Sequence, residues 1–105
     1  MNEARRRRLE AAGWKTGTLK DFLGLSDEEA AFIEVKYLLS SRLRERRREL
    51  RLTQQALAKR LGSSQSRVAK MEAGDASVSL DLLMLALFAL GETPRTLGRI
   101  IARAA

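Results

Sequence analysis

Hydrophobic residues recur at helical spacing along most of this 105-residue chain, between short stretches rich in glycine, serine and threonine. From Asp27 to about Leu50 they fall every three or four positions with no glycine or proline between them. This pattern predicts either one long helix or two helices that meet near residues 40–41. Ser26 and Glu29 form a capping box, which is typical of a helix start, so we expect the segment to begin there.

Two shorter amphipathic segments follow, joined by a tight turn. Thr53 is a good N-cap for the first segment, which ends at Gly62. Ser63 or Ser64 begins the second segment, which ends at Gly74. The residues expected to face the core are Leu57, Ala58 and Leu61 in the first segment, and Val68 and Met71 in the second. The opposite face of the second segment is polar and therefore available to a ligand.

Two further helices are predicted toward the C-terminus. Ser79 is the expected N-cap of a helix that extends to Ala89. Thr93 and Pro94 occupy the favoured N-cap and first positions of a last helix, which we expect to end at about Ala104. The pattern therefore predicts an all-α chain of about five helices.

The segment over residues 80–90 is hydrophobic almost all the way around. Each residue in it except Asp81 is apolar, and a core this small can cover only one face of the helix. We therefore expect a homodimer formed through this helix and the last one, with Leu85 or Phe88 at a two-fold contact. The alternative is a central helix that the monomer encloses fully.

The charge distribution points to an anionic partner. The formal net charge is +7, and residues 40–72 alone carry ten basic and three acidic side chains. The chain has neither cysteine nor histidine, which excludes disulfides, thiolate chemistry and the usual zinc sites. It also has no glycine-rich phosphate loop and no opposed pair of carboxylates. We therefore expect no enzyme activity, no cofactor and no metal site.

The two short segments joined by a tight turn carry a recognisable motif. From Leu52 to Gly74 the sequence is LTQQALAKRLGSSQSRVAKMEAG. It closely resembles the lambda-repressor-like, or XRE-type, helix-turn-helix family, whose pattern is Leu-Thr-Gln, then Leu-Ala, a glycine, Ser-Gln-Ser and a Glu-x-Gly ending. The likeness is clearest from about Leu43 to Leu90. It implies a lambda-repressor-like helix-turn-helix bundle with an N-terminal extension. The implied function is a sequence-specific DNA-binding transcriptional regulator, as a dimeric repressor on an inverted-repeat operator in double-stranded DNA.

The resemblance also assigns roles to individual residues. Gln54 stands where the family contacts a phosphate, at the start of the first motif helix. Gln65 and Ser66 begin the recognition helix, whose first residues reach deepest into the major groove, and a glutamine there can bind adenine with two hydrogen bonds. Arg67 and Lys70, on the same exposed side, are expected either to read guanine or to bind phosphate. The expected DNA-binding residues are Thr53, Gln54, Ser64, Gln65, Ser66, Arg67 and Lys70.

Arg47 and Glu72 stand where some members of the family have a buried ion pair between the first helix and the end of the recognition helix. Their implied role is structural. The neighbouring arginines are expected to form a charged helix face, from which some reach the DNA backbone. These arginines are Arg42, Arg44, Arg46, Arg48 and Arg51.

We expect residues 1–25 to form a basic N-terminal arm or extension and residues 26–105 to form the DNA-binding domain. The arginine run at residues 5–8 is typical of a solvated chain end, and the alternative is a defined DNA-binding arm. We expect the added segment that contains Trp14 to serve oligomerisation or partner binding, and the alternative is that Trp14 packs against the core. Small XRE-type proteins with such an addition are similar to antitoxins, so a cognate toxin protein is a candidate partner.

The apolar segments of the chain bear on where the protein resides in the cell. The first residues are basic without the apolar stretch of a secretion signal, and the longest apolar run, over residues 82–90, is too short to span a bilayer. We expect a cytoplasmic, nucleoid-associated protein with no membrane partner. The competing function is a non-catalytic interaction protein that holds an acidic protein or RNA through its basic face.

Overall fold

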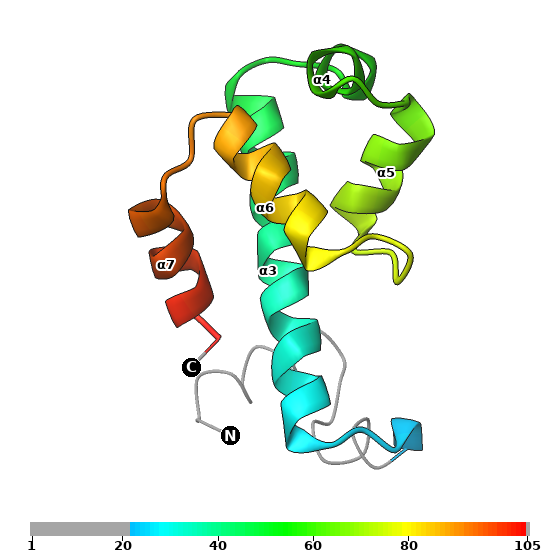
Figure 1. The fold of residues 1–105 in the computed structure, drawn as a ribbon, viewed down its shortest axis with the longest axis vertical. Helices are drawn as coiled ribbons and strands as arrows, with labels where there is room; N and C mark the ends of the chain where they lie inside the picture. Colours follow the sequence, from blue (N-terminus) through cyan, green and yellow to red (C-terminus); the bar gives the residue numbers. More distant parts are fainter. Residues whose placement is uncertain (1–21, 105) are drawn as a thin grey trace.

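The computed structural model describes residues 22–104, and within that range the chain is helical with no strand (Figure 1). The helices are α3 (Asp27–Glu49), α4 (Gln54–Leu61), α5 (Gln65–Ala73), α6 (Leu80–Ala89) and α7 (Pro94–Ala102). This confirms the prediction of an all-α bundle of about five helices. The arginine run at residues 5–8 and Trp14 lie outside the described residues, so the expectations for the N-terminal segment stay predictions.

α3 is one continuous helix of 23 residues, so the alternative of two helices meeting near residues 40–41 is wrong. The predicted capping box is present, because the Ser26 hydroxyl accepts from the Glu29 N–H and the Glu29 carboxylate accepts from the Ser26 N–H, each at 3.1 Å. Ser40 lies in the middle of α3 and is buried. A Cβ added to Gly74 would lie 3.6 Å from the Ser40 hydroxyl, so small residues on both sides let the end of α5 approach α3.

The ends of α4 and α5 are set by the residues predicted from sequence. Thr53 caps α4 by accepting a hydrogen bond from the Ala56 N–H at 3.0 Å. Ser64, and not Ser63, caps α5, since its hydroxyl accepts from the Arg67 N–H at 3.2 Å. Both helices end at a glycine with a left-handed backbone, φ +66° at Gly62 and +69° at Gly74, which a side chain would disfavour.

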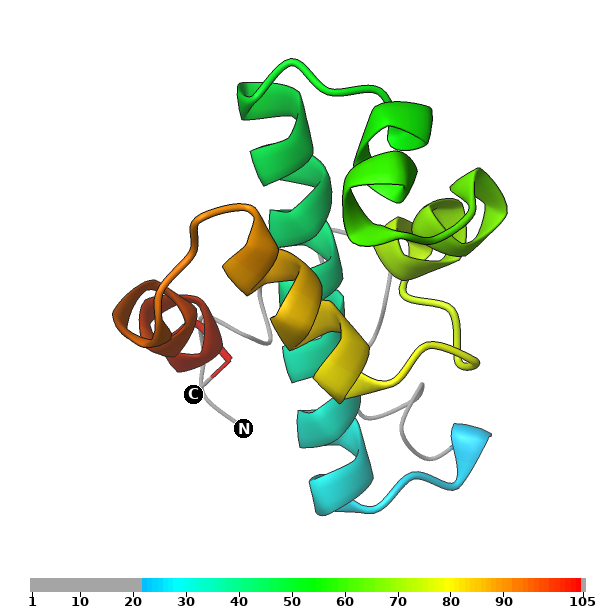
Figure 2. The ribbon, with the colours of Figure 1, turned by 45° about the horizontal axis from the view of Figure 1, so that its top comes forward.

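α3 is the central helix, and α5, α6 and α7 all pack against it (Figure 1). α6 crosses α3 on the side toward the viewer, while α4 and α5 lie on one flank of α3 and α7 lies on the other (Figure 2). The core takes side chains from all five helices, among them Leu39, Leu43, Leu57, Val68, Met71, Leu83, Leu87, Leu97 and Ile100. This arrangement leaves the outer faces of α4 and α5 uncovered by the rest of the described chain.

The described residues do not enclose α6, which contradicts the alternative of a central helix covered on all sides within this part of the chain. Leu83, Ala86 and Leu87 are buried, whereas Leu85 is 65% exposed and Phe88 is 38% exposed. Two large hydrophobic side chains on one face of α6 therefore meet solvent. Among the residues that the structure describes, no helix combines the length and the hydrophobicity needed to cross a bilayer.

Two arginines of α3 hold the turn between α6 and α7. The Arg42 Nε donates to the Glu92 carboxylate at 2.7 Å, and the Arg46 Nε donates to the Leu90 carbonyl at 3.0 Å. Burial opposes the charged form of Glu92, but hydrogen bonds from Thr96 and Arg42 outweigh it and lower the pKa of this carboxyl. Arg42 and Arg46 therefore serve the fold.

Candidate nucleic-acid interface

The helix-turn-helix presents a polar face to solvent because its hydrophobic residues are used on the inner side. α5 buries Val68 and Met71, and it leaves Gln65, Ser66 and Lys70 exposed. α4 and α5 pack closely against each other. The outer face of α5 therefore carries amide, hydroxyl and ammonium groups, which are the groups that meet base edges and phosphates in DNA-binding helices.

Gln65, the first residue of α5, is held by a neighbouring amide. The Gln55 side-chain Nε2 donates to the Gln65 Oε1 at 3.3 Å, and both side chains are exposed. A carbonyl oxygen has two lone pairs, so Oε1 keeps one for a further donor while the Gln65 Nε2 keeps its own N–H groups. The bond therefore sets how the Gln65 amide faces solvent. Sequence reasoning missed Gln55; its only local signal is an amide next to Gln54 in the first turn of α4.

Gln54 takes part in a different contact. Its Nε2 donates to the Glu72 carboxylate at 3.3 Å, and the residue is half-buried. Gln54 is the first residue of α4, and the Thr53 hydroxyl satisfies the Ala56 N–H. The first backbone N–H groups of α4 have no partner within the helix, as at any helix start. The positive end of the α4 dipole and these N–H groups form a favourable place for a phosphate.

Arg47 and Glu72 form an ion pair with two parallel hydrogen bonds. The Arg47 Nε and Nη2 donate to the two Glu72 oxygens at 2.6 and 2.9 Å, and only 12% and 4% of the two side chains are exposed. The hydrogen bond to Glu72 raises the pKa of Arg47 against the opposing effect of burial. Arg47 also donates to the Leu52 carbonyl at 2.8 Å. The pair therefore connects α3, the loop before α4 and the end of α5.

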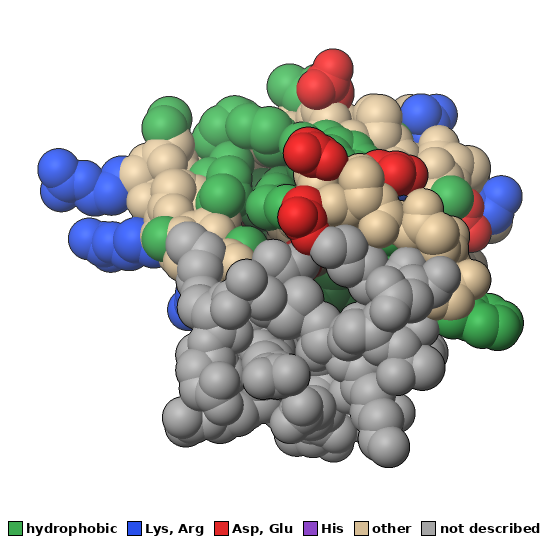
Figure 3. All heavy atoms as spheres, turned by 90° about the horizontal axis from the view of Figure 1, so that it is seen from below, with side chains coloured by type: hydrophobic (Ala, Val, Ile, Leu, Met, Phe, Trp, Pro, Cys, Tyr) green, Lys and Arg blue, Asp and Glu red, His purple; other side chains and the backbone are tan. Residues whose placement is uncertain are grey.

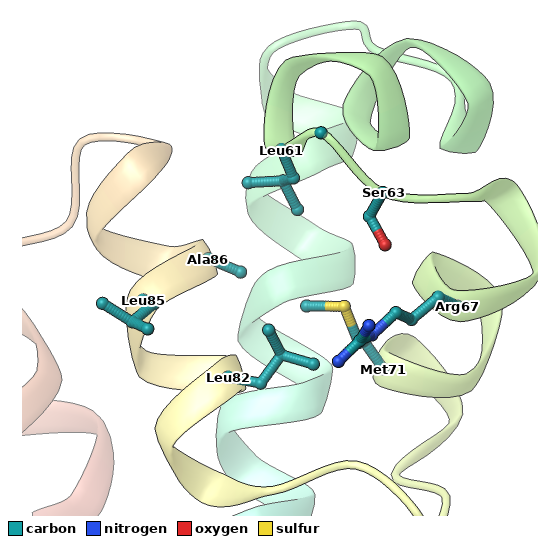
Figure 4. Close-up of a pocket in the computed structure, with 8 residues that line it drawn as sticks. Leu61, Ser63, Arg67, Met71, Leu82, Leu85 and Ala86 are labelled. Atoms are coloured by element: carbon teal, nitrogen blue, oxygen red, sulfur yellow. The ribbon is translucent and has the colours of Figure 1, made fainter.

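The basic side chains separate into two groups. Arg42, Arg46 and Arg47 are used in contacts inside the fold. In the described part of the chain, several other basic side chains are exposed and make no ion pair. These are Arg44, Arg48, Arg51, Lys59, Arg60, Arg67 and Lys70. The Arg67 side chain extends from α5 toward α6 (Figure 4).

The described residues include no group of three or more acidic, cysteine or histidine side chains placed to hold a metal ion. The polar groups of this surface are hydrogen-bond donors, acceptors and cations. Such groups can bind a duplex through its phosphates and base edges.

Comparison with protein families finds a model described as helix-turn-helix that matches residues 43–97, slightly more than half of the chain. The match contains all of α4, α5 and α6, the second part of α3 and the start of α7. Comparison with curated proteins and with solved structures gave no match.

Proposed function

Because the chain belongs to the lambda-repressor-like, XRE-type helix-turn-helix family and is thus a DNA-binding regulator, we propose that it acts as a sequence-specific dimeric repressor. Each protomer places α5 in the major groove of one half of an inverted-repeat operator. The half-sites are then about one helical turn, roughly 34–36 Å, apart.

The paired amides of Gln55 and Gln65 carry this proposal. A glutamine reads adenine when its Nε2 donates to N7 and its Oε1 accepts from the N6 amino group. With Gln55 on the other lone pair of Oε1, the Gln65 amide is oriented before DNA arrives, which reduces the entropy lost on binding. Gln65 is thus the proposed base-reading residue. Thr53, Gln54, Ser64 and Ser66 are the proposed backbone contacts beside it.

Dimerisation is proposed through α6 and α7. Leu85 and Phe88 lie three residues apart on α6, and Ile101 of α7 is 37% exposed. In the view from below, exposed hydrophobic side chains gather in one area beside projecting basic side chains (Figure 3). A patch of this kind favours a protein interface, and a two-fold axis would let one copy cover the same patch on the other.

The test is a selection of bound sequences from a random duplex library, followed by titration of the selected and a scrambled duplex at one salt concentration. We expect an inverted repeat and a clear preference for it. Gln65→Ala should cost about 1–3 kcal/mol on the selected duplex, relax one position per half-site and leave binding to the scrambled duplex nearly unchanged. Equal affinity of the unaltered protein for both duplexes would support an interaction protein that holds an acidic protein or RNA.

A second candidate role, as the antitoxin of a toxin–antitoxin pair, is favoured by the first half of α3. This half precedes the matched segment and exposes Phe32, Ile33 and Tyr37, which are 51%, 50% and 66% exposed. A toxin could cover these side chains while α5 binds DNA. The test is co-expression with a small adjacent reading frame: Ile33→Glu should abolish co-purification of its product and leave DNA affinity unchanged, whereas Ala31→Glu, at an exposed small residue, should not.

A further inference from the structure

A cleft of about 260 Å³ lies between α6 and the turn that joins α4 to α5 (Figure 4). Its apolar wall is formed by Leu61, Met71, Leu82 and Ala86. Leu85, a residue of the proposed dimer contact, also lines the cleft on the side away from Arg67, so the cleft and the proposed contact adjoin (Figure 4).

One end of the cleft is polar and positively charged. The Arg67 side chain reaches from α5 across the cleft toward α6 (Figure 4), and it makes no ion pair with another described residue. The Ser63 hydroxyl is shielded from solvent and has no hydrogen-bond partner among the residues described. No acidic residue lines the cleft. A shielded hydroxyl and an unpaired guanidinium therefore face one small space, and both gain from a ligand that accepts hydrogen bonds.

We propose that this cleft binds a monocarboxylate with an unbranched alkyl chain, such as hexanoate. The carboxylate accepts hydrogen bonds from the Arg67 guanidinium and the Ser63 hydroxyl, and the alkyl chain lies against Leu61, Leu82 and Ala86. One guanidinium matches one carboxylate in charge and in its fork-like geometry, and an apolar wall beside it matches an alkyl chain. The cleft measures about 260 Å³, which favours a small acid over a bulky ligand.

The position of the cleft connects this ligand to DNA binding, a step that rests on the proposed function. Arg67 is the third residue of α5, so a bound carboxylate holds this cation on the α6 side of the recognition helix. Without the ligand the same flexible side chain is free to turn toward a phosphate. The acid therefore competes with DNA for Arg67.

Binding is tested without DNA, by following backbone amide NMR signals of the full chain during titration with hexanoate. We expect saturable shifts for Gly62, Ser63, Arg67 and Ala86. Hexanol lacks the negative charge and acetate lacks the alkyl chain. The affinity for each should therefore be at least about tenfold lower than the affinity for hexanoate. Arg67→Gln should lower the affinity for hexanoate about tenfold, while Arg60→Gln, at an exposed arginine of α4 outside the cleft, should not change it.

Both altered arginines are exposed, so neither variant removes a buried contact on which the fold depends. Absence of saturable shifts, equal binding of hexanol, or unchanged affinity in Arg67→Gln would overturn the site. For regulation, saturating sodium hexanoate should weaken binding to the selected duplex severalfold relative to equal sodium chloride, and Arg67→Gln should not respond. If hexanoate leaves the affinity for the selected duplex unchanged, while the protein still prefers that duplex, the proposed regulation is overturned but the binding site is not. A protein with no duplex preference would instead contradict the proposed function.

Discussion

Arg47 and Glu72 join α3 to the last turn of α5 through two hydrogen bonds of 2.6 and 2.9 Å, in a setting that excludes nearly all solvent from the carboxylate. Gln54 donates to the same carboxylate, and Arg47 also donates to the Leu52 carbonyl. The start of α4 and the end of α5 therefore depend on one ion pair. Because α5 carries the proposed base-reading residue, the pair helps to fix the position of that residue.

Glu72→Ala should lower the free energy of unfolding by about 3–5 kcal/mol, because it leaves the Arg47 guanidinium buried without its counter-charge. Chemical denaturation followed by circular dichroism measures this. Glu45→Ala is the matched control, since the Glu45 side chain is 61% exposed and pairs with Arg42 at the surface, and it should cost at most about 1 kcal/mol.

Replacing both Arg47 and Glu72 with hydrophobic residues distinguishes the effect of an unpaired charge from the effect of lost side-chain volume. Arg47→Met combined with Glu72→Leu should be less destabilising than Glu72→Ala alone, because no unpaired charge is left inside. A denaturation midpoint of Glu72→Ala equal to that of the unaltered protein would contradict the structural role.

Gln55→Ala should weaken binding to the selected duplex by about 0.5–1.5 kcal/mol, although Gln55 reads no base itself. It removes the hydrogen bond that orients the Gln65 amide, so the loss should appear at the same base position as that of Gln65→Ala. A double-mutant cycle measures the coupling: in the Gln65→Ala background, Gln55→Ala should have almost no further effect. Additive losses would mean that the two glutamines act independently.

Lys70→Ala should weaken binding to selected and scrambled duplexes alike, because a phosphate contact carries no direct sequence information. The slope of log K against log salt concentration should become less steep by about 0.9 for the one lost phosphate contact. Arg99→Ala is the control, since Arg99 is exposed on α7, which lies on the opposite flank of α3 from α5 (Figure 2). A loss confined to the selected duplex would assign Lys70 to base reading instead.

The helix ends could be predicted from sequence because each depends on residues only a few positions apart. Thr53 accepts from the N–H three residues later, and Gly62 supplies its left-handed backbone by itself. The continuity of α3 had no such local signal. α3 packs against α5, and Ser40 in the middle of α3 is buried. The spacing of residues within α3 carries no information about a helix that begins 25 residues after Ser40.

The candidate site could be predicted only in part for the same reason. The spacing of hydrophobic residues predicted which face of α5 is exposed, but the contact between Gln55 and Gln65 depends on how α4 packs against α5. The arginines of α3 look alike in the sequence. Arg42 is used inside the fold because Glu92, fifty positions away, lies beside it, and no pattern of nearby residues shows that.

The contribution of Glu92 to stability should disappear in acid. The pKa of this carboxyl is lowered in the folded protein from its ordinary value of 4.5, so its stabilising effect is complete well above that value. It is lost as the pH falls through the lowered folded value. The difference in unfolding free energy between the unaltered protein and Glu92→Gln should therefore shrink from about pH 6 to about pH 3. A difference that stays constant over this range would contradict the assignment.

Leu85→Glu should convert the proposed dimer into a folded monomer. Leu85 is 65% exposed on the isolated protomer, so glutamate is tolerated there by the monomer, but in an interface its charge would lose solvent without a partner. Sedimentation at micromolar concentration measures the mass, and circular dichroism checks the fold. The monomer should bind one half-site weakly, because the linked second contact is lost.

The control variant is Ile33→Glu, which places the same charge at an exposed hydrophobic position of α3 and should leave the dimer intact. If Ile33→Glu dissociates the dimer and Leu85→Glu does not, the dimer contact lies in the first half of α3. If the unaltered protein is a monomer, the proposed dimer is contradicted.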